Sequence, residues 1–449
     1  MRYLIVIGSL CLAMSAGAQE AQVHGPDVEL RQRIESLIEK LESKRFADRQ
    51  SSEQQLLRLG PAAIESMRQA MEQADGEAKI RLQRILTELS RSIRMVDKVT
   101  SDLLKSVTSV SIDEHGHFLY ASAFAANTVS VYAINPEDGK LSLIETQTDK
   151  TDLQGAVAIR LSSTESMAVA ACFSGKSVTL FSRSEITGKL KKLDVYRGDA
   201  RSPTPSFPIE AVFSPNGKFV YCLDPSARDG KNVGGVMIFR VTDERKLQWI
   251  DTEMGQDSCF NNVRGIVFHP AKNELYLGAA DAGTLTRASF DPESGAITIE
   301  QVLRDGEKNV EGLSGVFALS ISDDGKFIYT SSGRFRGDSA VGVFMLNENG
   351  DLEVVQELIS GRDQMGDFLG GNELAISPDG KNVYVTGTRS STLAGFARDT
   401  ETGKLTFIET VPFGPRKLGP AGIAISPHGE YVYAAVEGES SIAIFRRDQ

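Results

Sequence analysis

The sequence of 449 residues has few cysteines, few histidines, one tryptophan and no excess of basic residues. The formal net charge of −11, without a cluster of lysine or arginine, argues against a nucleic acid or an anionic membrane surface as partner. The five histidines and four cysteines form no clustered ligand set, so we expect no metal site and no cofactor.

Sparse cysteines also exclude a disulfide framework. Cys11 lies inside an N-terminal apolar run, which leaves an odd number of cysteines in the rest of the chain. Cys172 and Cys222 fall in apolar strand patterns and are expected to be small buried thiols. Cys259 falls in a loop and is expected to be more exposed.

Long hydrophobic runs are absent after the first residues. Arg2, the apolar run from Tyr3 to Ala13 and the small-residue pattern Ala16-Gly17-Ala18 are typical of a secretion signal. The run is shorter than the roughly 20 residues that span a bilayer, although an uncleaved anchor is the alternative. We therefore expect residues 1–18 to be a signal peptide and the protein to be exported, periplasmic or extracellular, without a membrane span after cleavage.

A hairpin signature recurs seven times from residue 106 onward. A turn, commonly with glycine, precedes an apolar run, as in Pro215-Asn216-Gly217-Lys218-Phe219-Val220-Tyr221. The anchor positions stand 49 to 55 residues apart: Tyr120, Val169, Tyr221, Tyr276, Tyr329, Tyr384 and Tyr433. This period is typical of four-stranded propeller blades.

The strand pattern within each repeat supports this interpretation, because alternating apolar residues are bounded by glycine-containing turns. The last repeat stops after its third strand, and Met95 to Thr100 is predicted to supply the missing outer strand. The fold class is therefore mainly β: a seven-bladed β-propeller over residues 95–449, preceded by a small α-helical domain over residues 27–93.

The helical domain is predicted from apolar residues at helical spacing, with Gly60-Pro61 between two of about four amphipathic helices. It resembles the HEAT-like helical repeat pairs of some exported bacterial proteins, in the stretches Leu37 to Arg49, Leu56 to Ala63 and Lys79 to Leu86. That resemblance implies a module that contacts a protein partner, together with propeller loops, or acts as a spacer. A helical cap on the propeller is the alternative.

From about residue 95 to the end, the chain resembles the seven-bladed propeller lactonase family, whose best-known activity is hydrolysis of 6-phosphogluconolactone. The resemblance is carried by the repeat stretches Ser377 to Val385, Ser391 to Asp399 and Gly403 to Glu409. These stretches equally resemble a wider group of exported bacterial propellers with no assigned reaction. The single tryptophan, Trp249, disfavours the quinone-dependent propellers, which rely on a repeated tryptophan motif.

Some family positions are kept and others differ. Arg264 and Phe268-His269-Pro270 match the family's stretch that leads into a Phe-His-Pro strand, and Asp224 matches its aspartate in the preceding blade. Apolar or small residues replace other polar positions of the family, at Cys172-Phe173, Phe207-Pro208-Ile209 and Ala279-Ala280.

The mouth of the central channel, where first strands begin, is the expected ligand site. It offers Glu210, Asn262, Arg264, Asn372 and Glu373. As a lactone hydrolase, the protein would use Arg264 to stabilise the developing oxyanion and Glu210 or Glu373 as base.

Further ligand contacts would come from Asp224, Asn262, His269 and Asn372. The alternative is that these groups cap strand ends and hold channel water, with His269 a structural residue that aligns with the serine of other Ser-Pro turns.

Two functions follow from the sequence. One is a non-catalytic exported binding or scaffold protein. The other is a hydrolase of a sugar-acid lactone, and either could take a small sugar-acid ligand.

Overall fold

The computed structural model describes residues 26–59, 64–74, 76–89, 93–198, 203–225, 234–255, 257–335, 337–347, 349–414 and 418–447. The expected signal segment 1–18 and the Gly60-Pro61 boundary lie outside these residues. The chain divides into two compact units, with the division between Ser90 and Arg91.

The described residues of the first unit form four helices, as the apolar spacing predicts: α1 (Pro26–Lys40), α2 (Phe46–Leu59), α3 (Ile64–Gln73) and α4 (Gly76–Leu89). All four contribute to one buried apolar cluster, which includes Leu37, Leu56, Met67 and Leu82. Beside it the buried carboxylate of Glu53 pairs with Arg84 and, at 2.6 Å, with Arg81. None of the described helices has the length and apolar composition that a membrane-spanning helix needs.

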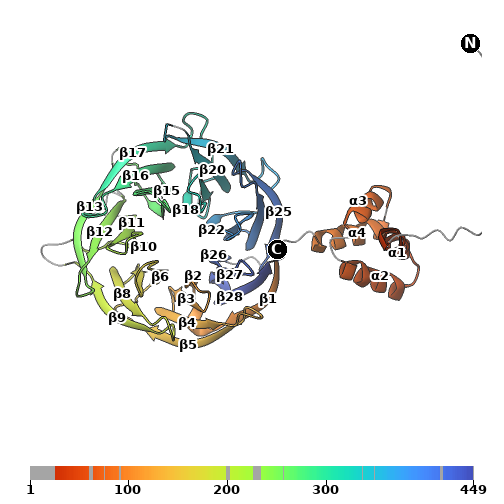
Figure 1. The fold of residues 1–449 in the computed structure, drawn as a ribbon, viewed down its shortest axis with the longest axis horizontal. Helices are drawn as coiled ribbons and strands as arrows, with labels where there is room; N and C mark the ends of the chain where they lie inside the picture. Colours follow the sequence, from red (N-terminus) through yellow and green to blue (C-terminus); the bar gives the residue numbers. More distant parts are fainter. Residues whose placement is uncertain are drawn as a thin grey trace, which may run out of the picture. The chain divides into compact units, whose positions relative to one another are not determined.

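The second unit is a seven-bladed β-propeller (Figure 1), which confirms the predicted fold class. Blades 1 to 3 contain β2 (Val107–Ile112), β3 (Phe118–Ala123), β4 (Thr128–Ile134), β5 (Leu141–Thr148); β6 (Ala156–Leu161), β7 (Met167–Cys172), β8 (Ser177–Arg183), β9 (Leu190–Tyr196); and β10 (Glu210–Phe213), β11 (Phe219–Asp224), β12 (Gly235–Val241), β13 (Leu247–Glu253).

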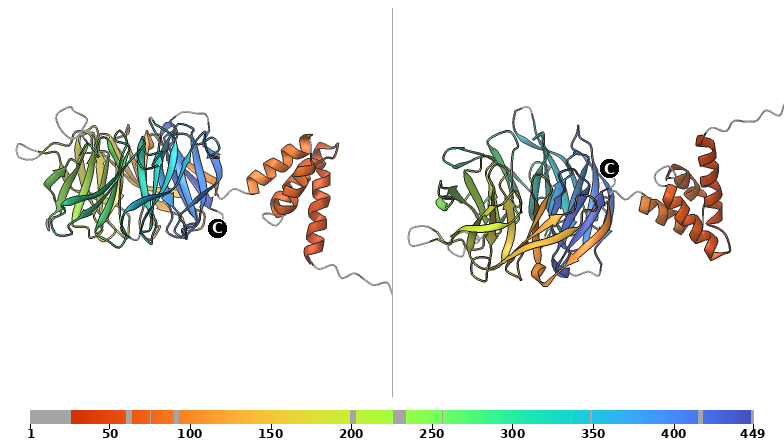
Figure 2. Two further views of the ribbon diagram at one scale, coloured as in Figure 1. Left: turned by 90° about the horizontal axis from the view of Figure 1, so that it is seen from above. Right: turned by 60° about the horizontal axis from the view of Figure 1, so that its bottom comes forward.

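Blades 4 to 6 contain β14 (Val263–Phe268), β15 (Glu274–Ala279), β16 (Thr284–Phe290), β17 (Ile297–Arg304); β18 (Val316–Ile321), β19 (Phe327–Ser332), β20 (Ala340–Leu346), β21 (Leu352–Ile359); and β22 (Gly371–Ile376), β23 (Asn382–Gly387), β24 (Thr392–Arg398), β25 (Leu405–Pro412). The first strand of each blade is innermost and contacts the first strands of both neighbouring blades. Seen edge-on, the strands run between the two faces of a disc (Figure 2).

Blade 7 joins the two ends of the propeller. It contains β26 (Pro420–Ile425), β27 (Tyr431–Val436), β28 (Ser441–Arg447) and, as its outer strand, β1 (Ile93–Thr100). β1 pairs antiparallel with β28, the orange and blue strands that lie side by side in Figure 1. The predicted source of the missing strand is therefore confirmed, and the seventh blade gains an outer strand from the other end of the sequence.

The repeated tyrosines hold neighbouring blades together. Four of the six donate a hydrogen bond of 2.8 or 2.9 Å to a glycine carbonyl in the outer turn of the next blade: Tyr120 to Gly188, Tyr221 to Gly295, Tyr329 to Gly403 and Tyr433 to Gly139. The aromatic ring two residues before each of these four tyrosines covers the same glycine. The sequence repeat thus encodes both a strand and a contact between blades.

One expectation about the core is wrong. Cys259, expected to be the more exposed cysteine, is fully buried, as are Cys172 and Cys222. It belongs to the apolar cluster that contains Phe260 and Val263, because the loop before β14 folds into the space between blades 3 and 4.

The turn glycines can be tested with a matched pair of alanine variants. Gly403 and Gly361 have φ values of +71° and +86°, but a Cβ atom at Gly403 would lie 2.2 Å from the Phe327 ring, whereas none lies within 4 Å at Gly361. Both variants incur a left-handed backbone cost of roughly 1–2 kcal/mol. Gly403→Ala should lose about 1–3 kcal/mol more, because the buried ring must move.

Urea unfolding followed by the fluorescence of Trp249 measures this difference, since the single tryptophan lies in β13 of the propeller. Equal losses in the two variants would contradict the packing role of Gly403.

Candidate functional site in the central channel

Six of the inner strands have a β-bulge near their start, which changes the direction in which side chains point. The pairing of the first strand with the second shifts register near this end in blades 1, 2, 4, 5, 6 and 7. A bulge turns the extra residue out of the regular alternation. Each of these six strands contributes a residue from its bulge to one pocket: Thr108, Val157, Arg264, Phe317, Asn372 with Glu373, and Ala421.

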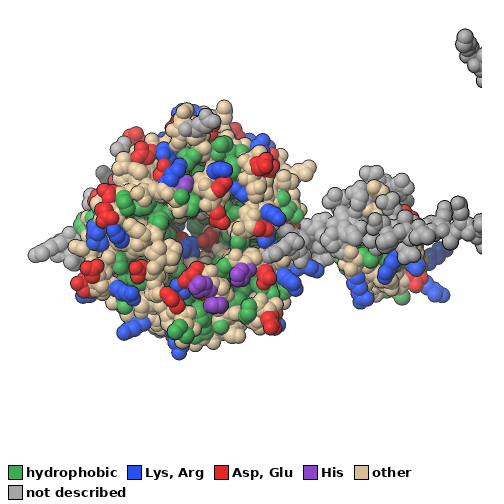
Figure 3. All heavy atoms as spheres, in the orientation of Figure 1, with side chains coloured by type: hydrophobic (Ala, Val, Ile, Leu, Met, Phe, Trp, Pro, Cys, Tyr) green, Lys and Arg blue, Asp and Glu red, His purple; other side chains and the backbone are tan. Residues whose placement is uncertain are grey.

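The pocket has a volume of about 370 Å³ and lies within the ring of inner strands. In Figure 3 the centre of the ring is hollow, and side chains of both charges are visible in it. The lining residues include three arginines and three glutamates: Arg160, Arg264, Arg334, Glu210, Glu373 and Glu437. The remaining lining residues are mostly apolar, so polar chemistry is concentrated at a few positions.

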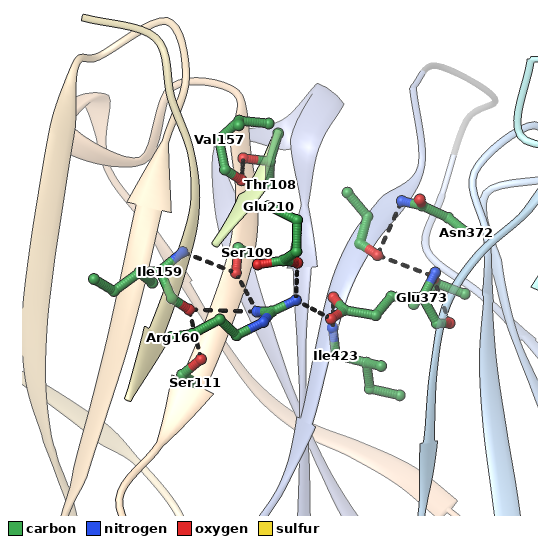
Figure 4. A network of polar contacts seen from close by, with 12 residues as sticks. Thr108, Ser109, Ser111, Val157, Ile159, Arg160, Glu210, Asn372, Glu373 and Ile423 are labelled. Carbon is green, nitrogen blue, oxygen red and sulfur yellow. Dashed lines mark hydrogen bonds and ion pairs between the residues drawn. The ribbon is translucent and has the colours of Figure 1, made fainter. Parts of the chain in front are cut away.

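Arg160 of β6 forms an ion-pair network across the channel (Figure 4). One of its terminal nitrogens, Nη2, lies 2.7 Å from Glu210 of β10 and 2.6 Å from Glu373 of β22. The other, Nη1, donates to the Ser109 hydroxyl of β2 at 2.7 Å. Blades 2 and 6 are three places apart in the ring of seven, so the pair between Arg160 and Glu373 spans the channel.

Backbone groups hold the two carboxylates in place. Glu373 accepts a hydrogen bond of 3.1 Å from the Ile423 amide in blade 7, and Glu210 accepts one of 3.1 Å from the Ala211 amide. Burial raises the pKa of Glu210 to about 7, although Arg160 acts in the opposite direction. Burial likewise raises the pKa of Glu373, again opposed by Arg160. Glu210 can therefore exchange a proton near neutral pH.

Arg264 and Arg334 line another side of the pocket and share two aromatic rings. Their guanidinium carbons lie 5.4 and 5.1 Å from the centre of the Phe317 ring, and 5.8 and 4.9 Å from that of Phe335. Arg334 also pairs with Glu437 at 2.9 Å. Such cation–π contacts hold the two positive charges close together at the pocket wall.

Four of the residues expected at the site line this pocket, namely Glu210, Glu373, Arg264 and Asn372. The Asn372 side chain donates to the Ala421 carbonyl at 3.0 Å. Asn262 is not among the lining residues, but its side-chain oxygen accepts a hydrogen bond of 2.7 Å from Arg264 Nε and so orients the guanidinium.

The other two expected residues lie elsewhere. Asp224 caps a loop, accepting hydrogen bonds from the Ser206 and Phe207 amides at 2.5 and 3.1 Å. His269 lies at the opposite end of β14 from Arg264, where its Nδ1 accepts from the Ala271 and Lys272 amides, each at 3.0 Å. These contacts are those of the structural histidine that the sequence left as an alternative.

Sequence reasoning missed Arg160, Arg334 and Glu437. A signal for Arg160 was available: a charged residue within the apolar inner strand Ala156–Leu161 has to point into the channel or find a buried partner. Arg334 and Glu437 follow the second strands of blades 5 and 7, where loop geometry determines what they reach.

The raised pKa of Glu210 predicts a pH dependence of stability. A carboxyl group with a folded-state pKa above its ordinary value favours folding below that ordinary value, about 4.5, and this stability is lost as pH rises toward about 7. Glu210→Gln should lose less stability than the wild type over this interval, by on the order of 2 kcal/mol.

Urea unfolding at a series of pH values measures this difference. The exposed-residue variant Glu293→Gln is the control and should follow the wild type. Parallel curves for Glu210→Gln and wild type would contradict a raised pKa at Glu210.

Comparison with known proteins extends these observations. The model of the family described as "Lactonase, 7-bladed beta-propeller" matches residues 85–207 and 261–415. An uncharacterized protein of Lactococcus lactis is 23% identical over 318 residues, which cover 70% of this chain and 86% of the relative. A protein of Arthroderma benhamiae named "Probable 6-phosphogluconolactonase" is 24% identical over 332 residues, covering 69% and 78% of the two chains.

Among solved structures, the periplasmic gluconolactonase PpgL of Pseudomonas aeruginosa aligns with a TM-score of 0.55 at 19% identity, covering 69% of this chain and 86% of its own. At this identity the likeness extends to the fold alone. The family model, in contrast, matches more than half of the chain, so the protein belongs to the seven-bladed β-propeller lactonase family.

Proposed function

We propose that the protein hydrolyses a lactone in the channel pocket. The observation that carries the proposal is the presence in one pocket of a buried carboxyl group with a pKa of about 7, Glu210, and a guanidinium group, Arg264. Hydrolysis of a cyclic ester needs a base for the attacking water and a donor for the oxygen that becomes negative. The family membership and the relatives named as gluconolactonases point to the same reaction class.

In the proposed reaction, ionised Glu210 accepts a proton from water as the water oxygen attacks the carbonyl carbon. Arg264, oriented by Asn262, donates hydrogen bonds to the carbonyl oxygen while it carries negative charge. The ring C–O bond then breaks, and the leaving alkoxide takes the proton from Glu210, which gives an open-chain hydroxy acid. Because the base is about half ionised near pH 7, the pKa suits catalysis at neutral pH.

A specific observation favours a second function, a non-catalytic binding protein. Both Glu210 and Glu373 already bind Arg160 and a backbone amide, so both carboxylates contribute to holding the blades together. In that case the pocket would retain a small sugar acid without converting it. Partner contacts would come from the propeller loops and the helical unit.

Hydrolysis and binding are separated by a pH-stat assay of sugar-acid lactones, including 6-phosphogluconolactone, above the spontaneous rate. We expect Glu210→Gln to lower kcat by about 100-fold or more and Arg264→Ala by roughly 100-fold. The wild-type kcat/KM should rise with pH through about 7, as Glu210 becomes ionised.

Arg362→Ala is the control, because Arg362 lies on an exposed loop and pairs with Glu311. The absence of turnover across the panel, with gluconate bound in calorimetry, would contradict hydrolysis and favour the binding protein.

The proposal also includes export and a HEAT-like, protein-contacting role for the helical unit. This unit exposes 61% of Phe46 and 69% of Ile80, which offers apolar surface that a partner protein would cover. N-terminal sequencing should find a mature chain that starts after Ala18. Photo-crosslinking from position 80, with exposed position 186 as control, tests the contact, and no position-specific product would contradict it.

A further inference from the structure

The pocket lining has a charged part and an aromatic part. Arg160, Glu210 and Glu373 form the charged part, and hydrogen bonds already join them to one another and to the backbone. Much of the remaining lining is apolar and includes four phenylalanines: Phe124, Phe173, Phe317 and Phe335.

One aromatic wall comes from blades 1 to 3. Phe173 directly follows β7, and its ring stacks on that of Phe207, with centroids 4.8 Å apart and planes inclined by 29°. Phe124 meets the other edge of Phe173, with centroids 5.9 Å apart. Phe207 keeps 38% of its surface exposed, and Lys176 lies 5.8 Å from the centre of its ring.

The opposite wall comes from blade 5. Phe317 and Phe335 meet edge to face with centroids 5.7 Å apart, and Phe335 is 64% exposed. Arg264 and Arg334 pack against both rings, which holds the rings in position before any ligand arrives. Blades 2 and 5 are three places apart in the ring of seven, so the two aromatic walls flank the mouth from opposite sides.

The cost of burying hydroxyl groups decides what such a pocket can hold. A hydroxyl buried without a hydrogen-bond partner costs about 1–3 kcal/mol, and phenyl rings offer no strong partner. A polyhydroxylated ring between these walls would incur this cost several times. An apolar ring would instead gain about 1.5–3 kcal/mol from burial, with a further contribution from ring stacking.

We infer that the pocket selects lactones whose ring carries an aromatic or other apolar body, in preference to polyhydroxylated sugar lactones. The ester group would lie at the charged end near Glu210 and Arg264, and the apolar body between the two aromatic walls. This inference rests on the proposed lactone hydrolysis for its reaction and on the phenylalanines for its substrate class. The volume of about 370 Å³ is at the small end for ligand pockets, which suits a bicyclic compound.

The test uses two matched pairs of probes. Hydrolysis is compared between dihydrocoumarin, an aromatic δ-lactone, and glucono-δ-lactone. Binding is compared by calorimetry between their lactam analogues, 3,4-dihydro-2-quinolinone and gluconolactam, in which an amide resists hydrolysis. The lactams measure ligand selection independently of catalysis.

We expect kcat/KM for dihydrocoumarin to exceed that for glucono-δ-lactone by at least about 10-fold, and the quinolinone to bind more tightly than gluconolactam. Phe335→Ser should reduce this preference by about 10-fold, mainly through KM, because it removes a ring surface that would contact the apolar body of the substrate. Phe335→Tyr keeps the ring and should retain the preference. Ile186→Ser is the control, because Ile186 is 90% exposed in an outer turn of blade 2.

The outcomes separate the substrate class from the reaction. Preference for the gluconate-derived pair would overturn the inference and leave lactone hydrolysis intact. Quinolinone binding that depends on Phe335, without turnover of either lactone, would overturn hydrolysis and support the apolar ligand class. Failure of both lactams to bind and of both lactones to react would overturn both.

Discussion

Arg160 is the residue on which the architecture of the channel depends. A propeller has no conventional core at its axis, and here a single guanidinium connects blade 2 to Glu210 in blade 3 and Glu373 in blade 6. Its third contact, with Ser109, adds blade 1. Removing one partner from such a buried network leaves uncompensated charge, which costs far more than the net stability that the intact network contributes.

The propeller is closed in two places by different interactions. At the rim, β1 pairs with β28, and four of the six repeated tyrosines connect successive blades through turn glycines. At the axis, the Arg160 network joins blades that are not neighbours in the ring. The rim contacts occur in most repeats, whereas Arg160 occurs in one. Residues that recur in the repeats therefore build the scaffold, and residues that differ between repeats build the pocket.

The same division explains what the sequence could predict. Fold, blade number and the origin of the closing strand follow from repetition, because each repeat is an independent instance of one pattern. Four pocket-lining residues could be predicted because they stand where inner strands begin, a position that the repeat identifies. Arg160 lies deeper in its strand, and its significance depends on two carboxylates that are 50 and 213 residues away.

Family resemblance directed attention to Arg264, which lines the pocket, and also to His269 and Asp224, which do not. His269 occupies the turn position at which other blades have serine, and like Ser162 it accepts hydrogen bonds from the amides two and three residues further on, in the turn. Asp224 similarly serves the backbone of a neighbouring loop. The aromatic walls could not be predicted, because they form from loop residues of different blades whose proximity only the ring closure determines.

A double-mutant cycle on Arg160 and Glu373 tests the central claim most directly. Unfolding free energies would be measured for Arg160→Met, Glu373→Gln and the double variant, above pH 7 so that the carboxylates tend to be ionised. The account predicts that Arg160→Met alone lowers the unfolding free energy by roughly 3–5 kcal/mol. It also predicts that the loss in the double variant is smaller than the sum of the two single losses, by about 1–3 kcal/mol. Losses that add to within about 0.5 kcal/mol would show that the two residues do not interact across the channel.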